Sequence, residues 1–161
     1  MLKIKIIGED ILRQMAEEVT EFDESLARLG EEMMETMHTA DGIGLAAPQV
    51  GISRRLIVTD ISPLEEQAKP RVFVNPVLME TSGECQLEEG CLSIPDVREV
   101  VSRPERILLR YQTVGGETEN EEFEGWMSRV LQHEIDHLNG VLFVDYLSPV
   151  KKKLISRQFA V

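Results

Sequence analysis

The chain has 161 residues, 42% hydrophobic and 29% charged, which is typical of a globular protein that forms one domain, here residues 1–161. A formal net charge of −12 argues against general nucleic-acid binding. No apolar run approaches the roughly 18 residues of a membrane span, and no signal-peptide pattern is present. Because two cysteines also argue against a disulfide framework, we expect a cytoplasmic protein without a membrane contact.

The hydrophobic pattern predicts short strands and two helices. Residues 2–7 are predicted to form a strand, and apolar residues at helical spacing predict a helix over residues 23–38. Further strands are predicted at residues 55–61, 72–78 and 107–114, with no ordered element between 61 and 70.

Gly115-Gly116 suits a hairpin turn into residues 117–124, whose many glutamates predict an edge strand that faces solvent. A second helix is predicted to begin near residue 126. We therefore predict an α+β fold with short, mostly antiparallel sheets around a central metal-binding helix.

This second helix carries the strongest chemical signal, the sequence HEIDH at residues 133–137. His133 and His137 are four residues apart, so on a helix both imidazoles face one side and can bind one divalent ion. Glu134 lies beside the first ligand and can take a proton from a water molecule at that ion. A metal, a glutamate and a water predict hydrolysis of an amide or an ester.

A catalytic site of this kind needs a third protein ligand. Phe143 occupies the downstream position where some related motifs have a histidine, so the ligand must come from upstream. His38, Cys85, Cys91 and many carboxylates are available there. We favour Cys91, because it lies in a glycine-containing, turn-like segment over residues 88–95 and a thiolate binds borderline or soft metals strongly. Two imidazoles and a thiolate suit Zn, Fe(II), Co or Ni.

Three blocks of the chain resemble the bacterial-type peptide deformylase family, in the family's order and at similar spacing. They are GIGLAAPQ at residues 42–49, EGCLS at 89–93 and QHEIDHLNG at 132–140. The resemblance implies that Cys91, His133 and His137 hold the metal, which would be Fe(II) in the cell. Water would be the fourth ligand.

The resemblance also implies a reaction, the removal of the N-formyl group, as formate, from the N-terminal formyl-methionine of newly made proteins. The metal-bound water would attack the formyl carbon, with Glu134 as general base and then as proton donor to the leaving amine. Gln49, through its side-chain amide, and Leu92, through its backbone N–H, would donate hydrogen bonds to the formyl oxygen. From the residues alone, another small metal amidase or protease, or a metal protein without turnover, stays open.

Residues near the three blocks are expected to bind the substrate. Arg129 would lie at the rim of the pocket, with its stem packed and its charge in water. Trp126 and Val130 would line the pocket, although both also suit a core position. Arg98 is either a ligand of the peptide backbone or an ordinary surface charge. The remaining expected pocket residues are Ile43, Gly44 and Leu87.

The end of the chain is basic. No acidic residue follows Asp145, and the cationic residues fall within seven positions, namely Lys151, Lys152, Lys153 and Arg157. The family resemblance implies that this segment contacts the ribosome, where a cationic stretch can bind RNA phosphates. A solvated tail explains the same charges.

Overall fold

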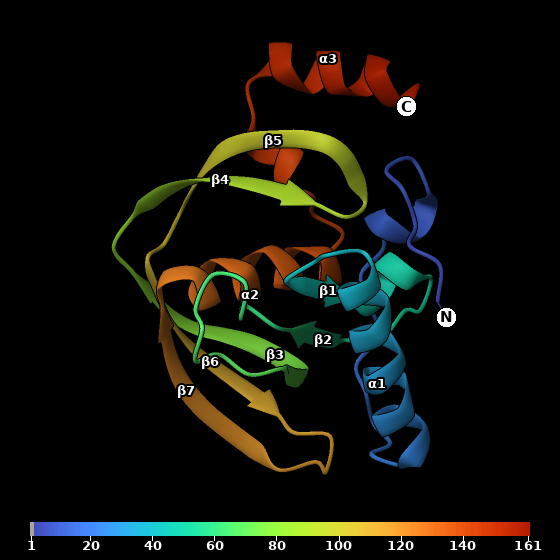
Figure 1. Cartoon of the computed structure of the whole chain (residues 1–161), viewed down its shortest axis with the longest axis vertical. Helices are drawn as coiled ribbons and strands as arrows, with labels where there is room; N and C mark the ends of the chain where they lie inside the picture. The colour runs from blue at the N-terminus through green and yellow to red at the C-terminus, as the bar shows by residue number, and fades with distance from the viewer. Residues whose placement is uncertain (1) are drawn as a thin grey trace.

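The computed structural model describes residues 2–161, in which all paired strands run antiparallel (Figure 1). Five strands form one sheet in the order β1-β2-β3-β6-β7, and β4 pairs with β5 in a separate ribbon. The larger sheet contains β1 (Gly44–Ala46), β2 (Leu56–Thr59), β3 (Arg71–Ser82), β6 (Arg106–Gln112) and β7 (Thr118–Glu124). The ribbon contains β4 (Cys85–Cys91) and β5 (Ile94–Arg103). The fold is therefore α+β with mostly antiparallel sheets, as predicted.

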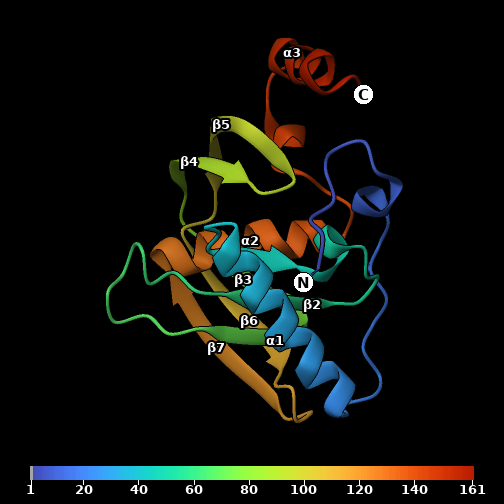
Figure 2. The same ribbon diagram turned by 45° about the vertical axis from the view of Figure 1, so that its right-hand side comes forward.

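Three α-helices accompany the sheets, α1 (Glu24–Thr39), α2 (Gly125–Leu138) and α3 (Pro149–Phe159). In both views α2 lies between the β4–β5 ribbon and the five-stranded sheet, while α3 lies beyond the ribbon at the end of the molecule (Figure 1, Figure 2). Short 3-10 helices, η1 to η3, cover Asp10–Arg13, Ala47–Val50 and Phe143–Tyr146. Within residues 2–161, no helix combines the length and the apolar character needed to cross a membrane.

The apolar face of α2 packs on the large sheet. Leu131, Ile135 and Leu138 form one buried cluster with sheet residues that include Phe73 and Leu109. Because helix positions three and four apart share a face, burying this stripe directs His133 and His137 away from the sheet, toward the ribbon. Hydrophobic packing thus sets the orientation of the histidines.

Helix α1 supports the segment that leads into β1. The side chain of Asp23 caps the helix by accepting a hydrogen bond from the Leu26 N–H at 3.1 Å. Met33 and Met37 are fully buried and belong to the same cluster as Leu45. This packing holds the Gly- and Ala-rich segment of residues 42–49 against the rest of the molecule.

Most of the predicted elements are confirmed. Helix α1 and strands β2, β3, β6 and β7 match the predicted ranges within a few residues, and β7 lies at the edge of its sheet. Residues 62–70 form turns without a helix or a strand. The predicted strand at residues 2–7 is wrong, because its hydrogen bonds go to two separate segments. The Lys5 N–H donates to the Gln49 carbonyl at 2.7 Å, and the Ile7 N–H donates to the Ser93 carbonyl at 2.8 Å.

The β4–β5 ribbon and the helix α3 were not predicted, and neither were the short strand β1 and the 3-10 helices. The segment of residues 88–95 is a turn only at Leu92 and Ser93, which join the long strands β4 and β5. The basic end of the chain is the helix α3, whose start signals were not recognised in the sequence. The Ser148 hydroxyl accepts from the Lys151 N–H at 3.3 Å, and Pro149 is the first helical residue.

Candidate metal centre

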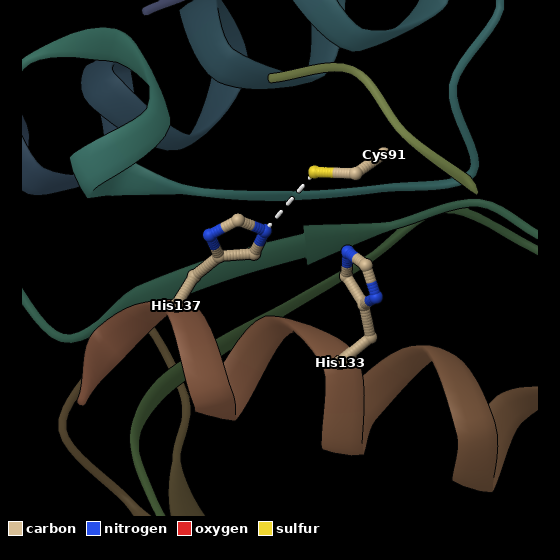
Figure 3. Close-up of side chains that lie close together, drawn as sticks. All are labelled: Cys91, His133 and His137. Atoms are coloured by element: carbon tan, nitrogen blue, oxygen red, sulfur yellow. Dashed lines mark hydrogen bonds between the residues drawn. The ribbon is translucent and has the colours of Figure 1, made fainter. Parts of the chain in front are cut away.

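Three potential metal ligands meet where α2 approaches the end of β4 (Figure 3). Cys91 Sγ lies 3.3 Å from His137 Nε2, and the ligand atoms of Cys91, His133 and His137 all lie within 4.8 Å of one another. The His133 and His137 residues are 7% and 1% exposed. This is the one group of its kind within residues 2–161.

The other histidine and the other cysteine lie elsewhere. His38 is in the last turn of α1, where its Nε2 lies 2.7 Å from the Asp60 Oδ2. Cys85 begins β4, at the opposite end of that strand from Cys91. Of the upstream histidine and cysteines considered as third ligand, the fold brings Cys91 alone to the two helical histidines.

Hydrogen bonding determines which His133 nitrogen faces the ligand cluster. His133 Nδ1 lies 2.9 Å from Glu89 Oε1. Because a carboxylate accepts, we place the proton of the neutral imidazole on Nδ1, which leaves the lone pair of Nε2 for a metal. His137 presents its Nε2 to Cys91 Sγ.

The three residues fit a divalent metal of borderline softness, since thiolate and imidazole are the donors that Zn, Fe(II), Co and Ni accept. The surrounding polar atoms support the same conclusion. Among residues 2–161, Glu134 Oε1 and His137 Nδ1 are buried and have no hydrogen-bond partner. A buried carboxylate oxygen and a buried imidazole nitrogen without partners are costly in an apolar core, whereas a site that receives an ion and a reactant uses them.

Glu89 was not predicted as a functional residue. It is 5% exposed and accepts from His133 and from Arg103, whose Nε and Nη2 lie 2.6 and 2.9 Å from its two oxygens. Burial alone would raise the pKa of Glu89, but the hydrogen bonds from His133 and Arg103 lower it to about 2. Strand alternation is the signal that would have found it. Its neighbour Glu88 points outward to Arg98, so Glu89 must point inward.

Arg129 also differs from its prediction. Its charge was expected to stay in water at the pocket rim, which is wrong because the residue is 4% exposed. The guanidinium donates to Glu89, to the Val101 carbonyl at 3.0 Å and to the Cys85 carbonyl at 2.6 Å. These acceptors replace the water molecules that the buried guanidinium would otherwise bind.

Glu134 is buried beside the ligands, and burial raises the pKa of its carboxyl to about 7. A divalent cation at the neighbouring ligands would lower that pKa again. Gly44 faces this side chain from β1. A Cβ at position 44 would lie 2.7 Å from Glu134 Oε2 and 2.7 Å from Val130 Cγ1, so only glycine fits there without displacement.

Gln49 is held in a fixed orientation. Its Oε1 accepts from the Ala46 N–H at 2.9 Å, which directs Nε2 toward Ser93 Oγ at 3.2 Å and Cys91 Sγ at 3.6 Å. The residue is 1% exposed. Leu92 follows Cys91 directly in the turn between β4 and β5. The fold thus brings Gln49 and Leu92 to the same ligand.

A cavity of about 570 Å³ adjoins the ligands. Leu87 is not among its lining residues and lies on β4 opposite Val101. Several residues that were not predicted also line the cavity, among them Pro63 and Leu64. The other predicted pocket residues all contribute, namely Ile43, Gly44, Arg98, Trp126, Arg129 and Val130.

Comparisons with known proteins place the chain in a family. A model of the polypeptide deformylase family matches residues 1–153. A peptide deformylase from Salinibacter ruber is 48% identical over 98% of this chain and 86% of its own length. The crystal structure of a Legionella pneumophila peptide deformylase has a TM-score of 0.92 at 42% identity and covers 99% of this chain and 94% of its own.

A Synechococcus elongatus peptide deformylase, solved in complex with actinonin, has the same TM-score of 0.92 at 42% identity. It covers 99% of this chain and 88% of its own. The chain therefore belongs to the polypeptide deformylase family, hydrolases that remove the N-formyl group.

Proposed function

We propose that residues 1–161 form one catalytic domain that removes formate from the N-terminal formyl-methionine of newly made proteins in the cytoplasm. Cys91, His133 and His137 hold one divalent metal, and Glu134 transfers the proton. The observation that carries this proposal is the meeting of the three ligand atoms within 4.8 Å of one another, beside the buried Glu134.

The metal supplies Lewis acidity when bound, which polarises the formyl group and lowers the pKa of water. Thiolate and imidazole ligands suit Fe(II), Zn, Ni and Co, and we propose Fe(II) in the cell on the strength of the family. The helix α2 is then the central metal-binding helix of the fold. It lies between the ribbon and the large sheet (Figure 1).

Glu134 has the properties of a group that both accepts and donates a proton. In the proposed hydrolysis, its carboxylate removes a proton from the attacking water, and the oxygen of that water bonds to the formyl carbon. The carboxyl then gives the proton to the amine nitrogen as the C–N bond breaks, which leaves formic acid and a free amine. The acid loses its proton to the amine or to solvent and leaves as formate. Burial raises the pKa of this carboxyl and a bound cation would lower it, and a carboxyl under these opposing influences suits both transfers near neutral pH.

Gln49 and Leu92 stabilise the charge that develops on the formyl oxygen. The side-chain amide of Gln49 is preorganised by its hydrogen bond from the Ala46 N–H, and the Leu92 N–H is the second donor. Donors that are already oriented toward developing charge lower the barrier without reorganisation. Removal of one such donor typically costs about 10²–10³ in rate.

The methionine side chain lies in the cavity beside the ligands, against Ile43, Trp126 and Val130. Gly44 keeps the backbone of β1 close to the reacting group. Arg98 lies at the rim, where its Nε donates to Glu88 at 2.7 Å, and can bind the peptide backbone. Arg129 supports Glu89 from inside the site. A direct role of Leu87 stays a prediction.

The ribosome is proposed as a partner through α3. Lys152 and Lys153 are exposed on this helix, whereas Lys151 already pairs with Glu99, with 2.9 Å between Nζ and Oε2. Exposed lysines near the end of a chain that is otherwise acidic can bind RNA phosphates locally.

The decisive assay measures formate release from a formyl-Met peptide by the Fe(II)-loaded protein under anaerobic conditions. We expect turnover by the wild type and none above background by Cys91→Ala, which loses a metal ligand. Absence of formate from the wild type would contradict the proposal. Cleavage of internal peptide bonds, with formyl-Met peptides left intact, would indicate a metal protease instead.

A further inference from the structure

We propose that Tyr146, through Asp136 and Arg103, is a positioning residue for the metal ligand His133. This inference rests on the proposed metal site and adds residues that do not touch metal or substrate. The supporting observation is a ring of hydrogen-bonded side chains that begins and ends on helix α2.

The ring starts and ends on helix α2. His133 Nδ1 lies 2.9 Å from Glu89 Oε1, and Glu89 in turn accepts two hydrogen bonds from Arg103. The remaining terminal nitrogen of Arg103 donates to Asp136 Oδ2 at 2.9 Å. Asp136 follows His133 by three residues, so the partner of the metal ligand is tied back to the ligand's own helix, nearly one turn further on.

Burial and charge make this ring stiff. The side chains of Glu89 and Arg103 are each 5% exposed, and that of Asp136 is 19% exposed. Two carboxylates, Glu89 and Asp136, face two guanidinium groups, Arg103 and Arg129, so the charges balance. A planar guanidinium that binds both carboxylates fixes the distance and angle between them, which lysine cannot do.

Tyr146 binds to this ring from the segment that follows α2. Its hydroxyl donates to Asp136 Oδ2 at 2.8 Å, the same oxygen that accepts from Arg103. Its ring also lies under Arg103, with 5.0 Å between the guanidinium carbon and the ring centroid. Tyr146 is 52% exposed, so removing its hydroxyl leaves the core packing intact.

The consequence concerns the hold on the metal. Without the hydroxyl, one donor fewer fixes the Asp136 carboxylate. The hydrogen bond from Arg103 to Asp136 then holds Arg103 less rigidly. Glu89 and the His133 imidazole then sample more orientations. Loss of a direct partner of a metal-bound histidine typically weakens metal binding about 10- to 100-fold. Tyr146 is several contacts away, so we expect metal release to accelerate by about three- to tenfold.

The chain offers a matched control. It has two tyrosines, and the hydroxyl of Tyr111 likewise donates to a carboxylate, Glu121 Oε1 at 2.8 Å, that also binds an arginine, Arg71. That group is on the large sheet, at β3, β6 and β7. Tyr146→Phe and Tyr111→Phe therefore each remove a hydroxyl that donates to a carboxylate paired with an arginine. The pair at Tyr146 is connected to His133, and the pair at Tyr111 is not.

The experiment follows metal transfer from the Co(II)-loaded proteins to a chelator, together with the Co(II) absorption spectrum. We expect Tyr146→Phe to release Co(II) about three- to tenfold faster and to shift the spectrum, with Tyr111→Phe like the wild type. Asp136→Asn should exceed Tyr146→Phe in its effect. Urea unfolding of the metal-free proteins checks that Tyr146→Phe is folded.

Two results contradict different claims. Equal release rates for the wild type and Tyr146→Phe, with one Co(II) bound by each, would overturn the positioning role alone. Failure of the folded wild type to bind one Co(II) per chain would overturn the proposed metal site, and the positioning role with it. Equal acceleration by Tyr111→Phe would show a general loss of stability and would also overturn the inference.

Discussion

Gly44 faces Glu134 so closely that a Cβ at position 44 would lie 2.7 Å from the carboxylate Oε2. The same Cβ would lie 2.7 Å from Val130 Cγ1 on the helix α2. Strand β1 and the helix therefore approach each other at a point where no side chain fits between them. This approach fixes the position of the Glu134 carboxylate relative to the cavity.

Replacing Gly44 with alanine should displace Glu134 and lower kcat/KM for a formyl-Met peptide by about 100-fold, because a shift near 1 Å at a reacting group costs that much. Steady-state kinetics with the metal content measured in parallel tests this. Gly30→Ala is the control, since a Cβ there lies 3.7 Å from Val72, an ordinary contact. Equal activity of Gly44→Ala and the wild type would show that Glu134 needs no fixed position.

Trp126 is the only tryptophan of the chain and lines the cavity. Trp126→Ala should raise KM for a formyl-Met peptide by roughly tenfold and change kcat little, because the apolar contact between Trp126 and the methionine side chain of the substrate is lost. A formyl-Ala peptide is the matched substrate, since its short side chain makes less of that contact. An equal rise in KM for both peptides would argue against a methionine pocket at Trp126.

Helix α3 should contribute to ribosome binding through its exposed lysines. Charge reversal of Lys152 and Lys153 to glutamate should weaken co-sedimentation with ribosomes and reduce its salt dependence, because two phosphate contacts are lost. Lys69→Glu is the control, since Lys69 is exposed in the segment between β2 and β3. If the double variant and the control co-sediment like the wild type, α3 is a solvated helix without this role.

Glu121 and Arg71 should make stability depend on pH. Hydrogen bonds from Arg71 lower the pKa of the Glu121 carboxyl below its usual 4.5. The folded state therefore favours the carboxylate, so its stabilising contribution is full above pH 4.5 and is lost as the pH falls through the lower folded-state pKa. The free energy of unfolding that Glu121→Gln removes should be larger at pH 7 than at pH 3.

Urea unfolding at both pH values tests this dependence. The difference should stay below about 1 kcal/mol, because the pair is partly exposed and solvent screens it. Glu119→Gln, on an exposed position of the same strand, serves as the control. An equal effect of Glu121→Gln at both pH values would mean that the ion pair does not favour the folded state.

The sequence predicted which candidate ligands lie together better than it predicted their surroundings. The helical motif and the short cysteine motif each fix local geometry, so Cys91, His133 and His137 could be named in advance as candidate ligands. The comparisons confirm the family, while the roles of individual site residues stay predictions. Glu89 escaped notice because β4 was not predicted as a strand, so the alternation that turns Glu89 inward could not be used. Its pairing with Arg103 and Arg129, which come from other elements, has no local pattern.

The secondary structure was likewise predicted correctly in some segments and missed in others. One-sided apolar stripes predicted α1 and α2, because a helix that packs on one face repeats every three to four residues. The ribbon of β4 and β5 was missed, since its charged residues resemble a solvent-exposed loop. Residues 2–7 have strand-like composition, yet the N–H groups of Lys5 and Ile7 donate to Gln49 and Ser93, which lie in different segments. Composition alone does not determine whether an extended segment finds a strand partner.

The most direct test of the account measures formate release and bound metal together for Glu134→Gln. This variant keeps the shape of the side chain and all three proposed ligands but cannot accept the proton. We predict one metal ion per chain, as in the wild type, and a loss of formate release by about 10²–10⁴-fold. Wild-type turnover by Glu134→Gln with the metal bound would contradict the assignment of Glu134 as the proton-transferring group.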